Sequence, residues 1–158
     1  MRRQALITQA SEQRTFASLL RAHASVTRRL SAQLLVEHGL TLSDYEVLLR
    51  LSRAPERRLR RVDLAEQVVL SASGITRLLD GLEASGLVER AACDSDRRVV
   101  YAVLTQAGLE KLEEASRSHV AQVAELFADR YDAAELAELE TLLERLAEPG
   151  APECEPAG

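Results

Sequence analysis

The 158-residue sequence lacks tryptophan, has 3% aromatic residues, and contains two cysteines and a single lysine, Lys111. Leu and Ala make up much of its 46% hydrophobic content, and both favour helices, so we expect a mainly helical protein. Cys93 and Cys154 lie far apart in the chain, which argues against a disulfide scaffold. Nearly all positive charge is arginine.

Long apolar runs are also missing from the sequence. No segment approaches the ~18 consecutive apolar residues that a membrane-spanning helix needs. Residues 1–20 lack the apolar core of a signal peptide. We therefore expect a cytoplasmic protein without a membrane partner.

Signatures of catalysis and of metal binding are absent as well. The chain has no Gly-rich phosphate loop, nucleophile elbow or catalytic-triad signature. Its three histidines, His23, His38 and His119, are widely separated and do not have structural-zinc spacing. The sequence thus predicts a non-enzyme with no metal site and no cofactor.

The acidic charge of the chain is concentrated in its last third. Residues 1–49 and 50–101 each carry a net charge of +2, whereas residues 102–158 carry −9, which gives −5 in total. A basic patch governs docking to nucleic acid more than the total charge does. The balance therefore leaves a nucleic-acid partner open for the first two thirds.

The stretch 59–107 is the most informative part of the sequence. It predicts a short helix at 63–68, a turn at 69–71, and a second helix at 72–84 that begins at the N-cap Ser71 and stops at Gly86. One apolar stripe of this second helix comprises Ile75, Leu78, Leu79 and Leu82. Two alternating runs, 87–91 and 99–104, then predict a hairpin with a polar tip.

Helix, turn, helix and hairpin follow one another as in a winged helix-turn-helix, which indicates DNA binding. The second helix presents Ser71, Ser73, Thr76 and Arg77 off its apolar stripe, and we expect these side chains to face a major groove. For Arg77 an alternative stays open, namely a phosphate contact or a pairing with Asp80 or Asp96. We expect Arg97 and Arg98 at the hairpin tip to enter a minor groove, with one of them oriented by Asp96.

These residues resemble the MarR family (multiple antibiotic resistance regulators). The matching segments are DLAEQVVLS, SGITRLLDGLEASGLVER and the wing signature DSDRRVVYAVLTQAG, in which the pattern falls on Asp96, Arg98, Leu104, Thr105 and Gly108. The resemblance covers residues 15–146. It departs at Val62, where family members often have a serine N-cap on the first motif helix.

The resemblance implies a homodimeric repressor of a nearby promoter, released by a small effector. We expect one chain, 1–158, with a DNA-binding lobe at 43–104 and helical dimerisation regions at 15–37 and 105–146. Apolar stripes on the flanking helices point to the same interface. A twofold dimer would read a near-palindromic site in double-stranded DNA.

The flanking segments have their own start and stop signals. We expect residues 1–12 to be frayed, a long helix at 15–37 that Gly39 ends, and a helix capped by Ser43 with Glu46 as its capping-box partner. Thr105 and Asp132 are expected to cap helices at 106–127 and 133–146. Residues 149–158 are expected to form a disordered tail.

A basic segment, PERRLRR, lies between the second helix and the motif. Its arginines are Arg57, Arg58, Arg60 and Arg61. Two interpretations remain open, namely a solvated connector or a segment in which Arg60 and Arg61 contact phosphates.

Three other roles also remain open. His23, Tyr45 and His119 are the candidates for an effector pocket, although His23 and His119 also fit satisfied core or interface histidines. Cys93 would carry the alternative function of a redox sensor, although the first helix lacks the thiol of peroxide-sensing family members. A winged-helix module that binds a partner protein is a further alternative.

Overall fold

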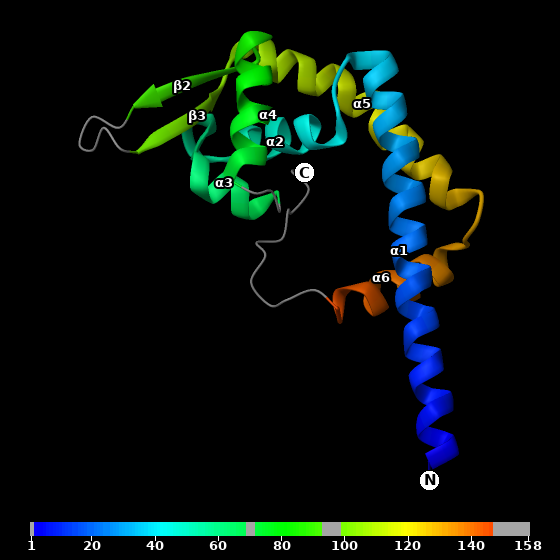
Figure 1. Cartoon of the computed structure of the whole chain (residues 1–158). Coiled ribbons are helices and arrows are strands. Elements are labelled where there is room, and N and C mark those ends of the chain that lie inside the picture. The colour runs from blue at the N-terminus through cyan, green and yellow to red at the C-terminus, as the bar shows by residue number, and fades with distance from the viewer. Residues whose placement is uncertain (1, 69–71, 93–98, 147–158) are drawn as a thin grey trace.

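The computed structural model describes residues 2–68, 72–92 and 99–146, whose arrangement Figure 1 shows. The described elements are α1 (Arg2–His38), α2 (Leu42–Arg53), η1 (Pro55–Arg57), β1 (Arg58–Arg60), α3 (Arg61–Gln67), α4 (Ala72–Ala84), β2 (Val88–Ala92), β3 (Val100–Leu104), α5 (Gln106–Ala128) and α6 (Ala133–Glu144). The predicted fold class, a mainly helical protein with a small β-hairpin, is confirmed. The expected disordered tail, 149–158, lies outside the described residues.

The helices α2, α3 and α4 form one lobe together with the sheet, and α1 and α5 extend from it as long helices (Figure 1). A single apolar core fills this lobe and reaches the carboxyl half of α1 and the amino half of α5. Its fully buried side chains include Leu34, Val47, Leu48, Leu51, Leu64 and Ile75. Residues 10–29 of α1 and all of α6 contribute no buried residue to the core.

The sheet has one strand more than the sequence predicts. Its order is β1-β3-β2, with both pairings antiparallel and with Arg60 opposite Tyr101 and Ala92 opposite Val100. The connector interpretation of the basic segment is therefore wrong for its last residues, because Leu59 packs against the core while its neighbours pair with β3. Glu56 (φ 54°) turns the chain into β1 in the left-handed region.

The first helix is longer than predicted. It begins at Arg2 instead of residue 15, so the expectation of a frayed segment at 1–12 is wrong from residue 2 onward. Residues 2–14 contain neither proline nor glycine, and once a helix has nucleated, each added residue extends it at little cost. Gly39 ends the helix with φ +68°, as predicted.

The cap of α2 lies two residues before the predicted one. Thr41 Oγ1 accepts the Asp44 N–H at 3.1 Å, and Asp44 Oδ2 accepts the Thr41 N–H at 2.8 Å, which completes a capping box. Ser43 and Glu46 have the same spacing but lie inside the helix. The prediction selected the wrong one of two overlapping boxes.

The other caps divide between confirmed and corrected predictions. Thr105 caps α5 through the Gly108 N–H at 3.0 Å, and Asp132 caps α6, both as predicted. The N-cap of α3 is Arg60, so Val62 lies within this helix and not at its cap.

Candidate nucleic-acid interface

Helix α4 presents one apolar and one polar face, as its periodicity predicts. Ile75, Leu79 and Leu82 are buried against the core. Ser73 and Arg77 are exposed and Thr76 is half-buried, so these candidate base-reading side chains lie off the buried stripe. Gly86 (φ +72°) follows the helix and lets the chain turn into β2. Ser71, the predicted N-cap, lies outside the described residues.

Helix α3 packs against α4 and completes the helix-turn-helix. Leu64 is fully buried and Val68 is 9% exposed, so both side chains belong to the lobe's core. The shared core fixes α4 as the outer helix of the pair, with its polar face directed away from α2.

The hairpin of β2 and β3 stands beside α4 and projects from the lobe on the side away from α1 (Figure 1). The described ladder runs from Val88 opposite Leu104 to Ala92 opposite Val100. The tip between these strands contains Asp96, Arg97, Arg98 and Cys93, all of which lie outside the described residues. The predicted minor-groove contact and the redox alternative stay predictions.

The arginines of β1 and of the first position of α3 differ in the partners that they have within the chain. The Arg60 guanidinium donates to both carboxylate oxygens of Asp63, at 2.7 and 2.8 Å, and this pairing raises the pKa of Arg60. Arg58 pairs with Glu56 at 2.6 Å and lies over the Tyr101 ring at 5.1 Å. Among the described residues Arg61 forms no ion pair, and its side chain is exposed.

Arg77 and Asp80, one turn apart on α4, are not partners. Asp80 instead accepts a hydrogen bond from Arg90 of β2, and Arg90 Nε also forms an ion pair with Glu83 at 2.8 Å. Within the described part of the chain Arg77 forms no ion pair, so the pairing of Arg77 with Asp80 is not found.

The Arg90 cluster is a feature that the sequence reasoning missed. Asp80 and Glu83 are three residues apart and therefore share a helix face, which is a readable signal. Their partner on the following strand is not readable, because it depends on how the hairpin packs against α4.

The candidate effector residues are only partly brought together. The rings of Tyr45 and His119 lie 4.5 Å apart, and Tyr45 Oη is 3.2 Å from Ser116 Oγ, which joins α2 to α5. His38, the last residue of α1, contacts Ser118, which directly precedes His119. His23 is exposed and lies fifteen residues before His38, which at 1.5 Å per residue is roughly 22 Å along the helix. His23 is therefore not a core histidine of one chain, and the interface alternative stays a prediction.

His119 is the more informative of the two histidines that were expected to be buried. Burial lowers its pKa from the ordinary value of 6.5, and its Nδ1 atom is buried without a hydrogen-bond partner in the described residues. The nearby His38 imidazole, which the sequence left unassigned, has Nε2 2.7 Å from Ser118 Oγ and binds α1 to α5.

In residues 2–68, 72–92 and 99–146, the structure contains no group of three or more His, Cys, Asp or Glu side chains suited to a metal ion. Over the same ranges every helix is too short or too polar to cross a membrane.

Comparisons with known proteins agree on one family. The MarR family profile matches residues 40–100. Sco3205, a MarR family transcriptional regulator from Streptomyces coelicolor solved in complex with DNA, is 30% identical and matches with a TM-score of 0.81 over 91% of this chain and 90% of its own.

Two further relatives support the same assignment. AbsC, a MarR family transcriptional regulator from the same organism, is 38% identical, with a TM-score of 0.72 over 84% of this chain and 91% of its own. The HTH-type transcriptional regulator MhqR of Bacillus subtilis (strain 168) is 28% identical over 113 residues, which are 72% of this chain and 76% of that protein.

Proposed function

The chain belongs to the MarR family of transcriptional regulators, and from this premise we propose that it is a homodimeric repressor that binds a near-palindromic operator. The observation that carries the proposal is the outward polar face of α4, held beside the hairpin by the core of the lobe. The match to Sco3205, whose structure contains DNA, supports DNA as the partner. DNA is thus the proposed partner of residues 43–104.

We assign base reading to the first two turns of α4. Ser73, Thr76 and Arg77 lie near its amino end, where side chains reach base edges when such a helix enters a major groove. Arg97 and Arg98 would enter the adjoining minor groove, and Arg61 would hold a phosphate. Arg60 would contribute less, because Asp63 already occupies the Nε and Nη2 edge of its guanidinium.

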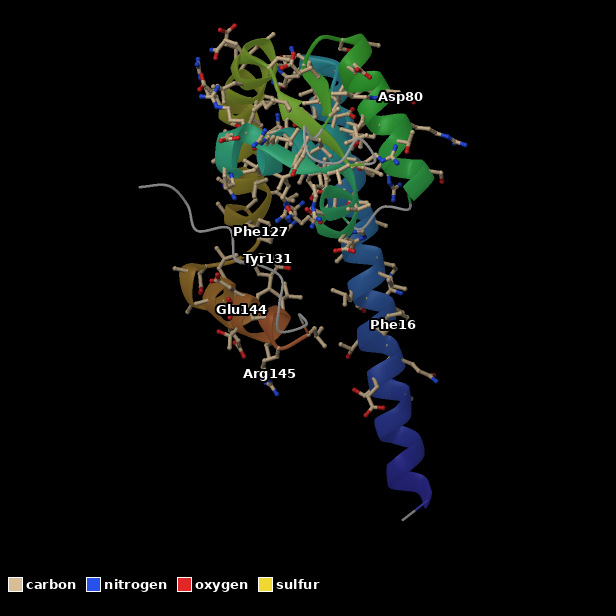
Figure 2. All side chains as sticks on the ribbon, turned by 90° about the vertical axis from the view of Figure 1, so that its left-hand side faces the viewer. Phe16, Asp80, Phe127, Tyr131, Glu144 and Arg145 are labelled. Carbon is tan, nitrogen blue, oxygen red and sulfur yellow. The ribbon has the colours of Figure 1, made fainter. Side chains whose placement is uncertain are left out.

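The proposal of a homodimer rests on apolar surface that one chain leaves uncovered. Phe16 is 62% exposed and Leu146 is 70% exposed, and no residue of α6 is buried. Figure 2 shows α6 on the side of α5 and apart from the amino half of α1, so these two helices do not cover each other within the chain.

A second copy can cover these surfaces. A groove of about 700 Å³ runs between α5 and α6, and its lining includes Val123, Phe127, Leu136, Leu139 and Leu143. Apolar area of this kind is the usual mark of an interface. We therefore propose residues 15–37 and 105–146 as the dimerisation region, which would set two copies of α4 about 34 Å, or a multiple of that, apart.

For release from DNA we propose an effector that acts at the contact of Tyr45 with His119. This contact joins α2 of the lobe to α5, so a ligand bound there would bias the spacing of the two lobes of a dimer. A ligand that prefers a spacing unsuited to DNA lowers DNA affinity by that preference. His23 is left out of this proposal because it lies too far along α1.

Selection of bound sequences from a random DNA pool tests the proposed function. The expected result is a motif with twofold symmetry whose half-sites lie about one helical turn, or a multiple of it, apart. An asymmetric motif would refute the twofold dimer on DNA. Failure to retain any DNA at moderate salt would refute the proposed function and favour the protein-interaction module instead.

A further inference from the structure

One side chain links the base-reading helix to the hairpin. Arg90 lies on β2, and its guanidinium forms ion pairs with Asp80 and with Glu83 on α4, the latter at 2.8 Å. The two carboxylates are three residues apart on one helix face, so a single guanidinium fork reaches both. We call these three residues the Arg90 brace. Figure 2 labels Asp80 on α4.

Apolar packing between α4 and the sheet is incomplete beside the brace. A cavity of about 90 Å³ lies there, and its lining includes Thr76, Glu83, Arg90 and Tyr101. Close-packed side chains hold neighbouring elements at one angle, and a cavity removes part of that constraint. The angle between α4 and the hairpin therefore depends more on polar contacts here than elsewhere in the core.

We propose that Arg90 is a positioning residue, which sets the angle between α4 and the hairpin so that both can engage one operator half-site. This inference rests on the proposed function, because it assigns Arg90 a part in operator recognition. It requires no contact between Arg90 and DNA, since both of its described contacts are to α4.

The brace contributes more to geometry than to stability. Arg90, Asp80 and Glu83 have side-chain exposures of 45%, 54% and 41%, and exposed ion pairs add little to the free energy of unfolding. Base reading, in contrast, is sensitive to small errors of placement, because hydrogen bonds to base edges need the correct distance and angle. Loss of the brace should therefore reduce sequence preference far more than it lowers the melting temperature.

The decisive variant is D80N/E83Q, because a purely electrostatic effect and loss of the brace predict different changes in its DNA affinities. Removal of two negative charges from α4 should tighten binding to every DNA if charge alone matters. Loss of the brace should instead lower the ratio of operator to non-specific affinity by about tenfold, which is the size of one lost base contact. The matched control is E66Q/E89Q, which also removes two negative charges from the lobe. Glu66 and Glu89 form no ion pair among the described residues.

Substitutions of Arg90 itself provide the second part of the experiment. R90Q added to D80N/E83Q should change the affinity ratio no further, because the brace is already broken. The charge-exchanged variant D80N/E83R/R90E should recover much of the parent's preference. If R90Q in the D80N/E83Q background weakens binding to all sequences and lowers the salt slope, Arg90 is a phosphate ligand and the proposal is wrong.

A measurement without DNA separates failure of this proposal from failure of the proposed function. Residual dipolar couplings of backbone amides report the orientation of α4 relative to β2 and β3. The orientation should be single in the parent and in E66Q/E89Q, and changed or averaged in D80N/E83Q. An unchanged orientation would overturn the brace even if the parent reads an operator. A changed orientation would support it even if the parent shows no sequence preference.

Discussion

The ring of Tyr45 lies against the imidazole of His119, with centroids 4.5 Å apart and planes inclined by 48°. Tyr45 is 6% exposed, and it belongs to the first helix of the lobe, whereas His119 lies midway along α5. Partial burial in this contact lowers the pKa of His119 below 6.5. The neutral ring is therefore the form that the folded protein favours.

Stability should consequently fall as pH is lowered past His119. In the unfolded chain this histidine binds a proton near pH 6.5, whereas the folded chain binds it at lower pH. The free energy of unfolding should decrease from about pH 6.5 down to the folded pKa and then level off as far as His119 is concerned. Urea denaturation of the parent and of His119→Gln between about pH 8 and about pH 5 measures this contribution as the difference between two curves. Parallel curves would remove His119 from the pH dependence.

The helices of this fold were more predictable than their contacts. The stripe of Ile75, Leu79 and Leu82 was correctly placed in the core, because a 3.6-residue period is written in neighbouring residues. The cap of α2 was not, because Thr41 with Asp44 and Ser43 with Glu46 satisfy the same local pattern. Burial of Leu40, which is 3% exposed, favours the earlier start, and burial is a tertiary property.

Long-range pairing explains the remaining errors. Strand β1 consists of Arg58, Leu59 and Arg60, which as a local sequence indicates a solvated loop, and it becomes a strand by pairing with β3 some forty residues later. The partners of Arg90 were unpredictable for the same reason. Ser73, Thr76 and Arg77 could be assigned to the polar face of α4 because helix periodicity alone determines that face.

Gly108 provides a prediction about stability. A Cβ at this position would meet the backbone oxygen of Leu87 and would lie 2.7 Å from Leu104 Cδ1, so something must move. The same turn holds α5 in place, because Thr105 Oγ1 donates to the Gly86 carbonyl at 2.7 Å. Gly108→Ala should lower the free energy of unfolding by about 2 kcal/mol, as overpacking exceeds the gain in helix propensity.

Gly81 offers the matched control for Gly108→Ala. It also lies inside a helix, but a Cβ built on it has no neighbour within 4 Å. Gly81→Ala should therefore raise the free energy of unfolding by about 0.5–1 kcal/mol, the propensity difference alone. Chemical denaturation of both variants measures the contrast. Equal effects of the two substitutions would show that the approach of Leu87 does not constrain position 108.

The proposed dimer can be tested at the groove between α5 and α6. Leu139→Asp combined with Leu143→Asp places two charges on an apolar lining that a second copy would cover. An unpaired charge in an apolar contact costs several kcal/mol, so the dimer dissociation constant should rise by about a hundredfold or more. Light scattering at micromolar concentration should show monomers, while removal of residues 149–158 should leave the dimer intact. A parent that is monomeric under these conditions would contradict the proposal.

Arg77 provides the prediction that bears most directly on base reading. Its exposed side chain lies one turn from Ser73 on the polar face of α4, and it forms no ion pair among the described residues. An arginine in this position can donate to O6 and N7 of a guanine, which discriminates by about 1–3 kcal/mol. Arg77→Ala should therefore relax preference at one symmetric pair of operator positions and leave non-specific affinity nearly unchanged.

Arg61→Ala is the matched comparison for Arg77→Ala, because both substitutions remove one guanidinium from the proposed DNA face. Arg61 is the first residue of α3 and lies outside α4, so we expect it to hold a phosphate and to contribute equally to every sequence. Its loss should weaken operator and non-specific binding alike and reduce the salt slope by about one. Binding profiles across a set of single-base operator variants, measured at several salt concentrations, separate the two outcomes. If Arg77→Ala gives the profile expected for Arg61→Ala, Arg77 serves the DNA backbone. In that case Ser73 and Thr76 remain as the side chains of α4 that read bases.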